Sequence, residues 1–236
     1  MQENTGDPDT LSSASDHSAG DFSDWLDQTQ SIFRHQKTGA DVPCGTCTAC
    51  CRSYQFIQIQ PDETETLRAI PKELLFQAPG FPKGFQLLGH NEKGECPMLV
   101  KNSCTIYKVR PKTCRNYDCR IFPATGMNLE GKNHAPVRER AGRWRFDLSS
   151  RNSAGRYHAT TAAGQFLRTH IGRFSPGLLP TNPAQLAVLA LLIESIFTED
   201  GTVSKMTDPE PELTRIVRRI SEFVTELRKS SAQENP

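Results

Sequence analysis

The cysteines of this chain are concentrated in one segment, and this concentration constrains the fold more than any other feature. All eight lie between Cys44 and Cys119 in a chain of 236 residues, and the segment opens with the run Cys44-Gly-Thr-Cys47-Thr-Ala-Cys50-Cys51. A cysteine that fills a core behaves as a small apolar residue and is not expected at such short, regular intervals. The spacing therefore predicts that the thiols bind metal.

The spacing also bears on the kind of metal centre. Cysteines two residues apart reach one metal or one cluster from a tight loop, whose backbone N–H groups stabilise the thiolates. Three cysteines in succession at this spacing resemble the run of bacterial ferredoxins, in which a distant cysteine, often followed by proline, completes a 4Fe–4S site. Cys96, which precedes Pro97, is a candidate for that distant ligand. The candidate metal ligands are all the cysteines: Cys44, Cys47, Cys50, Cys51, Cys96, Cys104, Cys114 and Cys119.

Zinc is the main alternative metal. Structural zinc sites usually combine two separated CxxC pairs, or one such pair with two histidines. The gaps between Cys104, Cys114 and Cys119 are too wide for a second CxxC pair, which favours an iron–sulfur cluster. Eight thiolates would also suffice for two zinc sites of four cysteines each. Disulfides are a third interpretation, and the crowding of four thiols into eight residues argues against them.

The adjacent Cys50 and Cys51 are expected to have different roles. Neighbouring side chains point about 100° apart on a helix and to opposite faces on a strand, so the two thiols are not expected to bind one ion together. Either they serve two centres, or one is a ligand and the other packs or acts as an exposed thiol. His90 is a lesser candidate ligand, because a lone histidine in a turn-like segment is more often a turn residue.

Three motifs resemble a known family. The elements CGTCTACC, ECPML and CTIYKVRPKTCRNYDC are similar to the YkgJ-type cysteine-cluster family, described as a zinc- or iron-chelating CxxCxxCC domain. The resemblance covers about residues 43 to 123 and implies metal chelation by the cysteines. A related cluster occurs in flagellin lysine N-methylases, so a cluster-dependent methyltransferase or redox enzyme is an alternative at the level of the family.

The resemblance also directs attention to residues beside the cysteines. Arg110 and Arg115 would offset the negative charge of a four-thiolate centre and donate hydrogen bonds to sulfur or to nearby carbonyl groups. Tyr107 and Tyr117 are expected to pack over the centre as lids. We therefore expect Arg110, Arg115 and Tyr107 to contact the bound cofactor.

The predicted fold is α+β, with a small irregular cysteine-rich domain and a mainly helical C-terminal region. Residues 1–21 are expected to be a disordered acidic tail, because they contain too few apolar residues to offset chain entropy. Residues 22–41 are expected to form an amphipathic helix and linker. Residues 42–125 then form the metal-binding domain, with short strands and helical turns, and residues 126–236 the helical region.

Local patterns predict several elements of the cysteine domain. Residues 54–60 alternate as a strand does, and Asp62 with Glu65 forms a capping box for a short helix. Residues 85–88 and 98–100 are predicted to be the strands of a short hairpin.

The C-terminal region has clearer helical signals. Asn182 followed by Pro183 predicts an N-cap and a buried helix to about Phe197. Residues 153–171 are a weaker helical candidate, and an apolar repeat every three or four residues predicts a closing helix from Pro209.

The charge pattern leaves the partners open. Residues 1–33 carry seven acidic side chains and no Lys or Arg, whereas residues 132–173 carry nine bases against two acids. Residues 138–146 interleave arginines with Trp144 and Phe146, a pattern that could stack on single-stranded nucleic acid. A half-buried strand edge explains this segment better. We therefore interpret the basic residues as a solvated surface. A zinc-stabilised interaction module whose basic residues bind RNA or an acidic partner is the less favoured interpretation.

The expected location is cytoplasmic, without a membrane span. The acidic opening lacks the basic and apolar regions of a secretory signal, and the longest apolar run has eight residues, whereas a span needs about twenty. Thiols in the cytoplasm stay reduced. The leading prediction is a protein that holds a 4Fe–4S cluster, or zinc, for structure or electron transfer.

Overall fold

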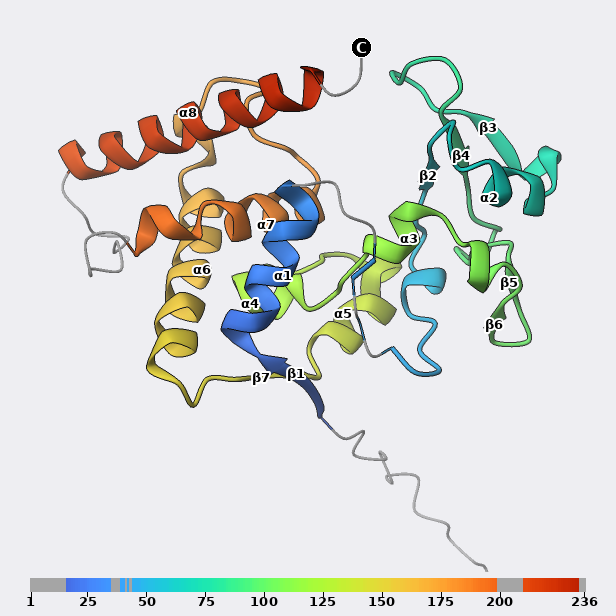
Figure 1. Cartoon of the computed structure of the whole chain (residues 1–236), viewed down its shortest axis with the longest axis horizontal. Helices are drawn as coiled ribbons and strands as arrows, with labels where there is room; N and C mark the ends of the chain where they lie inside the picture. Colours follow the sequence, from blue (N-terminus) through green and yellow to red (C-terminus); the bar gives the residue numbers. More distant parts are fainter. Residues whose placement is uncertain (1–15, 35–38, 41, 43, 199–209, 234–236) are drawn as a thin grey trace, which may run out of the picture.

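The computed structural model describes residues 16–34, 39–40, 42, 44–198 and 210–233. The predicted α+β class is confirmed, with short strands in small sheets and a mainly helical C-terminal region. The described residues pack into a larger, helical core and a smaller core built on short strands (Figure 1). The helices of the larger body are α1 (Phe22–Arg34), α4 (Ile121–Thr125), α5 (Ala135–Ala141), α6 (Arg151–Thr169), α7 (Pro183–Leu192) and α8 (Glu210–Gln233).

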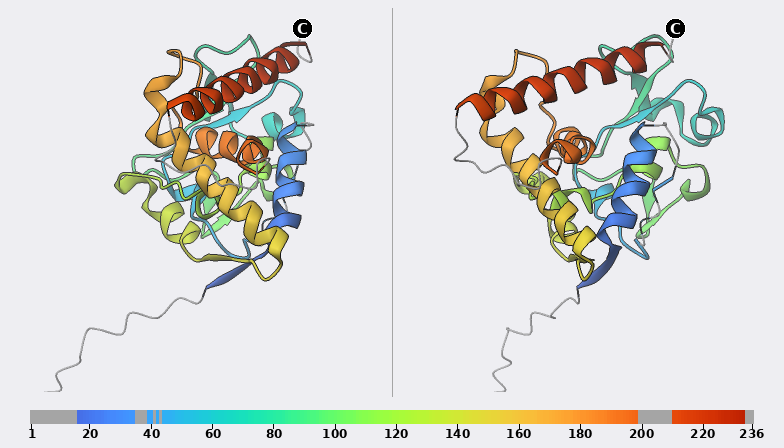
Figure 2. Two further views of the ribbon diagram at one scale, coloured as in Figure 1. Left: turned by 90° about the vertical axis from the view of Figure 1, so that its left-hand side faces the viewer. Right: turned by 60° about the vertical axis from the view of Figure 1, so that its left-hand side comes forward.

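The larger core forms where the apolar faces of these helices meet. Phe22 and Leu26 of α1, Leu167 of α6, Leu191 of α7 and Ile220 of α8 are all fully buried. The amphipathic helix predicted after residue 21 is therefore confirmed, and its apolar face packs on the chain's own core. Helices α1 and α4 each contact α6 and α7, which also contact each other, and α8 crosses one end of the group (Figure 2).

A short parallel ribbon joins two distant parts of the chain. Strand β1 (His17–Asp21) pairs with β7 (Trp144–Asp147), with His17 opposite Trp144. The prediction that residues 1–21 are disordered is thus wrong for His17–Asp21, and residues 1–15 lie outside the described part. The backbone of this polar segment finds partners in β7, and the side chain of Ala19 is buried in the larger core.

The smaller core rests on a three-stranded antiparallel sheet of order β2-β4-β3, which comprises Ile57–Ile59, Gln86–Leu88 and Leu75–Gln77. Helix α2 (Thr64–Ala69) and a 3₁₀ turn, η2 (Lys72–Leu74), lie between β2 and β3 in the sequence. The buried side chains of this core are Ile59, Ile70, Leu88, Met98 and Ile106.

The hairpin predicted from residues 85–88 and 98–100 is wrong in its pairing. The first segment, β4, pairs with β2 and β3. The second, β5 (Leu99–Val100), pairs instead with β6 (Ser103–Cys104). Lys101 and Asn102 between them have φ of 48° and 62°, which matches the two-residue turns that suit the twist of a tight hairpin.

The predicted start of α2 is also corrected. The N-cap residue is Glu63, and its side chain makes no capping bond. The carboxylate of Asp62 pairs instead with the ammonium of Lys112 at 2.7 Å. The predicted strand over residues 54–60 shortens to Ile57–Ile59, because Tyr54 has a positive φ of 53° and donates its backbone N–H to Gly94.

In the C-terminal region the predicted N-cap is confirmed. The side chain of Asn182 accepts hydrogen bonds from the backbone N–H groups of Ala184 at 2.9 Å and Gln185 at 3.3 Å. Helix α7 ends earlier than expected, and a 3₁₀ turn, η6 (Glu194–Phe197), follows it. The closing helix is confirmed from Glu210, whereas Pro209 lies outside the described residues.

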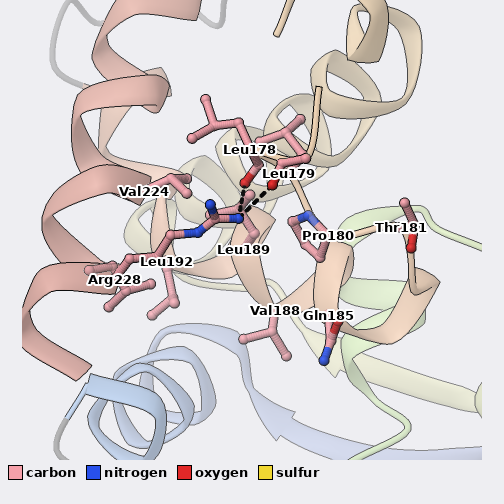
Figure 3. A pocket seen from close by; sticks show the side chains of 12 residues that line it. Leu178, Leu179, Pro180, Thr181, Gln185, Val188, Leu189, Leu192, Val224 and Arg228 are labelled. Carbon is pink, nitrogen blue, oxygen red and sulfur yellow. Dashed lines mark hydrogen bonds between the residues drawn. The ribbon is translucent and has the colours of Figure 1, made fainter. Parts of the chain in front are cut away.

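Helix α8 is fixed to the loop that precedes α7. The guanidinium of Arg228 donates hydrogen bonds to the carbonyl oxygens of Gly177 at 2.9 Å and Leu178 at 2.6 Å (Figure 3). Beside this contact lies an open cavity of about 520 Å³, lined mainly by aliphatic side chains such as Leu189 and Val224. None of the helices in the described ranges is long and apolar enough to cross a membrane.

Candidate metal centre

The eight cysteines line a single cavity of about 500 Å³. They reach it from three segments, which are residues 44–51, residues 96–104 and residues 114–119. Cys119 belongs to the larger core, whereas Cys96 and Cys104 pack against the smaller one. The cavity therefore lies where the two cores approach each other, and its lining includes Cys114 of α3 (Lys112–Asn116) and Arg140 of α5.

The first segment is a tight loop. Cys47 donates its backbone N–H to the carbonyl of Cys44 at 3.0 Å, and Gly45 between them has a φ of 57°, which glycine adopts without steric cost. The loop ends in a 3₁₀ turn, η1 (Cys50–Arg52). The carbonyl of Cys51 then accepts the backbone N–H of Cys96 at 2.7 Å, which fixes the first cysteine segment to the second.

The second and third segments complete the wall. Strand pairing places Cys104 opposite Leu99, three residues after Cys96. Cys114 lies in α3, which follows the 3₁₀ turn η3 (Tyr107–Val109) as the sequence predicts. Cys119 is buried, and its sulfur accepts a hydrogen bond from the indole Nε1 of Trp144 at 3.2 Å.

The thiols lie close enough to influence one another's protonation. Burial raises the pKa of Cys114, and the charges of Cys50, Cys96 and Cys104 raise it further. Burial raises the pKa of Cys119 to about 12, although the bond from Trp144 opposes the shift. Burial thus favours the protonated form of Cys114 and of Cys119, and a cation bound by these two thiols would have to displace their protons.

Cys50 and Cys51 do not diverge as their adjacency in the sequence predicts. Both line the same cavity, and a hydrogen bond with the Cys51 thiol raises the pKa of Cys50. The two thiols of this 3₁₀ turn thus contact each other, and the different roles expected of them stay a prediction. The charge of Cys50 also raises the pKa of Cys44, of Cys96 and of Cys114, after the effect of burial on each.

The three residues expected to contact a cofactor, Tyr107, Arg110 and Arg115, all line the cavity. The guanidinium of Arg110 lies 4.1 Å from the ring centre of Tyr107, which is 59% exposed, and donates to its carbonyl. Arg115 donates to the carbonyl of Arg110 at 2.6 Å and lies 3.8 Å from the carboxylate of Glu63. Both guanidinium groups thus have partners within the protein.

Arg140 also lines the cavity, although the cysteine motifs gave no reason to expect it at the site. It lies in α5, whereas residues 138–146 were expected to be one strand, so that prediction is wrong for the segment up to Ala141. The sequence does contain a signal for this helix, because Pro136 suits a first helical turn and because Val137 and Ala141 have helical spacing.

His90 lies apart from the cavity lining. Its ring is 5.1 Å from the ring centre of Tyr54 and 5.0 Å from that of Phe56, and its Nδ1 contacts the carbonyl of Asn91. Trp144 is 2% exposed, and the ring of Phe146 packs edge-on against Phe22. The aromatic residues of the basic segment are thus occupied in the core, as expected of a half-buried strand edge.

The donor set suits a thiophilic metal or cluster, because eight soft thiols and nearby cationic groups surround one cavity. The thiols are spread around the wall. Within the described ranges, no three His, Cys, Asp or Glu side chains converge closely enough to hold a single ion.

The fold and the site define a small cysteine-cluster domain joined to a helical body. Residues 43–137 match the family model CxxCxxCC, whose description is "Putative zinc- or iron-chelating domain". The resemblance inferred from the motifs is thereby confirmed for this segment. No curated protein and no solved structure matches the chain.

Proposed function

We propose that the cysteine cavity holds an iron–sulfur cluster of the 4Fe–4S type, which serves structure or electron transfer. One observation carries the proposal: cysteines from three separate segments line a single cavity of about 500 Å³. Such a cluster is held by thiolates and supplies one-electron chemistry when it is bound. The chain's own contribution is to gather the thiols, to shield them and to offset their charge.

Four cysteines are the proposed cluster ligands: Cys44, Cys47, Cys50 and Cys96. The first three have the spacing of a ferredoxin loop, and Cys96 precedes a proline. Two observations support this set of ligands. Cys47 and Cys44 close one turn of the loop, and the charge of Cys50 acts on both Cys44 and Cys96. The other cysteines supply further donors at the same cavity.

The distribution of the thiols favours a cluster over a single zinc ion. Zinc–sulfur bonds of about 2.3 Å bring four thiolates to within about 4 Å of one another. The thiols here surround a cavity much larger than one ion, and they approach from two different cores. A cluster, with its own iron and sulfide atoms, spans more of that space. A cytoplasmic location, which keeps thiols reduced, suits this proposal.

The test is metal and sulfide analysis of full-length protein purified without oxygen. We expect a brown protein with iron and acid-labile sulfide in about equal amounts. The absorption spectrum should show the broad visible bands of a cluster, and these should bleach on reduction.

Zinc is the competing outcome. Stoichiometric zinc without sulfide, in protein kept anaerobic from lysis onward, would overturn the cluster and leave a zinc site built from the same cysteines. Protein that contains neither metal, and takes up neither during anaerobic reconstitution, would overturn metal binding by this chain.

A further inference from the structure

Two buried polar atoms on the wall of the cysteine cavity have no hydrogen-bond partner in the described structure. They are the hydroxyl of Tyr117 and the Nε of Arg140. A buried polar group without a partner costs about 1–3 kcal/mol, so such groups call for an explanation. Both can donate a hydrogen bond, and both line a cavity whose other polar groups are mainly thiols.

Arg140 is held in place by two aromatic neighbours. Its guanidinium lies over the indole of Trp144, 4.7 Å from the ring centre, and its Nη1 contacts the imidazole Nε2 of His17. Burial and the charge of Arg140 lower the pKa of His17, which suits a neutral imidazole that accepts this hydrogen bond. The same indole donates to Cys119. These contacts fix the guanidinium while leaving Nε unpaired.

Tyr117 lines the same cavity as Arg140. It lies two residues before Cys119, and its ring packs against the larger core. The hydroxyl is therefore held by the packing of its ring, and no group among the described residues is placed to accept its proton. Arg110 and Arg115 differ, because their guanidinium groups donate to backbone carbonyls.

We propose that Arg140 and Tyr117 donate hydrogen bonds to sulfur atoms of the metal centre near Cys119. The inference rests on the proposed function, because it requires a centre whose thiolate or sulfide atoms accept the bonds. The two residues are positioning and charge-compensating groups. They stabilise the more negative states of the centre, and so they set its metal affinity and, in a cluster, raise its reduction potential.

The test compares Tyr117→Phe and Arg140→Gln with two matched controls in full-length protein loaded anaerobically. Tyr54→Phe removes a hydroxyl, and Arg145→Gln removes a charge; neither residue lines the cavity. Metal affinity is measured by competition with a chelator, and the midpoint potential by redox titration. Each cavity variant should hold the metal 10- to 100-fold more weakly, the range typical of groups that support ligands, and should lower the potential of a cluster. The controls should change neither.

The outcomes separate this inference from the proposed function. If wild-type protein holds no metal, the proposed function fails. If wild-type protein holds the centre and both cavity variants match it in affinity and potential, only the inference is overturned. Tyr117→Phe keeps the ring that packs on the core, so it provides a folded variant even where Arg140→Gln does not fold. A zinc-bound protein is judged by the affinity measurement alone.

Discussion

The indole Nε1 of Trp144 donates a hydrogen bond to the sulfur of Cys119 across 3.2 Å. Trp144 belongs to β7 and is almost fully buried in the larger core. On the other side of the cavity, Cys96 and Cys104 pack against the smaller core. A centre that uses cysteines from both sides would therefore join the two bodies, so metal binding and the stability of the cysteine domain should be coupled.

The first prediction concerns that coupling. Replacing Cys44 or Cys47 by Ser should release the metal and unfold most of residues 43–123, because ligation supplies folding free energy. Helices α1, α6 and α7 share a core that does not need the loop, so most of the helical circular dichroism signal should persist. Metal analysis and limited proteolysis of the two variants check both parts.

A neighbouring substitution controls for disturbance of the loop. Thr46→Ser keeps a hydroxyl between the same two cysteines and should leave metal content and melting temperature unchanged. Cysteine variants with full metal content and the wild-type melting temperature would show that Cys44 and Cys47 are not ligands.

The second prediction separates Cys50 from Cys51. The charge of Cys50 acts on Cys44, Cys96 and Cys114, whereas the backbone of Cys51 is occupied in the contact with Cys96. We expect Cys50→Ser to abolish the centre and Cys51→Ser to leave most of it, as measured by metal and sulfide per chain. Equal and complete loss in both variants would indicate that both thiols are ligands, in one centre or in two.

The sequence predicted features that depend on local pattern. The burial of Phe22, Trp25 and Leu26 follows from helical spacing, and the cap at Asn182 follows from side-chain chemistry and the next proline. The gathering of the cysteines follows from their spacing. The helix and its cap are each encoded within a short stretch of the chain, whereas the cysteines carry their own signal across three segments.

Features that depend on distant pairing were not predictable in the same way. His17–Asp21 becomes a strand only because Trp144–Asp147 lies beside it, and the polar segment itself carries little strand signal. The position of Arg140 depends in turn on α5, whose short helical pattern competes with an alternation of arginines and aromatic residues. Tertiary packing decided both cases.

The third prediction uses two glycines of α6. A Cβ at Gly164 would lie 2.2 Å from the carbonyl oxygen of Thr125 in α4, so Gly164→Ala must push the helices apart. Overpacking of this kind costs roughly 1–3 kcal/mol of unfolding free energy. A methyl group at Gly155 would meet no other atom within 4 Å, so Gly155→Ala should instead stabilise by roughly 0.5–1 kcal/mol. Chemical denaturation measures both; a Gly164→Ala protein as stable as wild type would show that α4 and α6 do not pack this closely.

The fourth prediction concerns Asp21, the last residue of β1, which directly precedes α1. Its carboxylate accepts hydrogen bonds from the hydroxyl of Ser153 at 2.6 Å and from the backbone N–H of Asp24 at 3.1 Å. The bond from Ser153, followed by that from Asp24, lowers the pKa of Asp21 from its ordinary value of 3.8. The charged carboxylate thus caps α1 and ties it to the start of α6.

A carboxyl group whose pKa is lower in the folded than in the unfolded protein stabilises the fold above its unfolded pKa. This contribution should be fully present at neutral pH and be lost as the pH falls from about 4 through the folded pKa. Asp21→Asn should therefore be less stable than wild type at pH 7, and the difference in unfolding free energy should narrow below about pH 4.

Ser153→Ala should raise the pKa of Asp21, as read from the titration of its carboxyl carbon by NMR. Asp24→Asn, which removes an exposed carboxylate one turn away, is the matched control and should show a weaker pH dependence. A stability difference between Asp21→Asn and wild type that is the same at pH 3 and pH 7 would exclude the charged carboxylate as the cap.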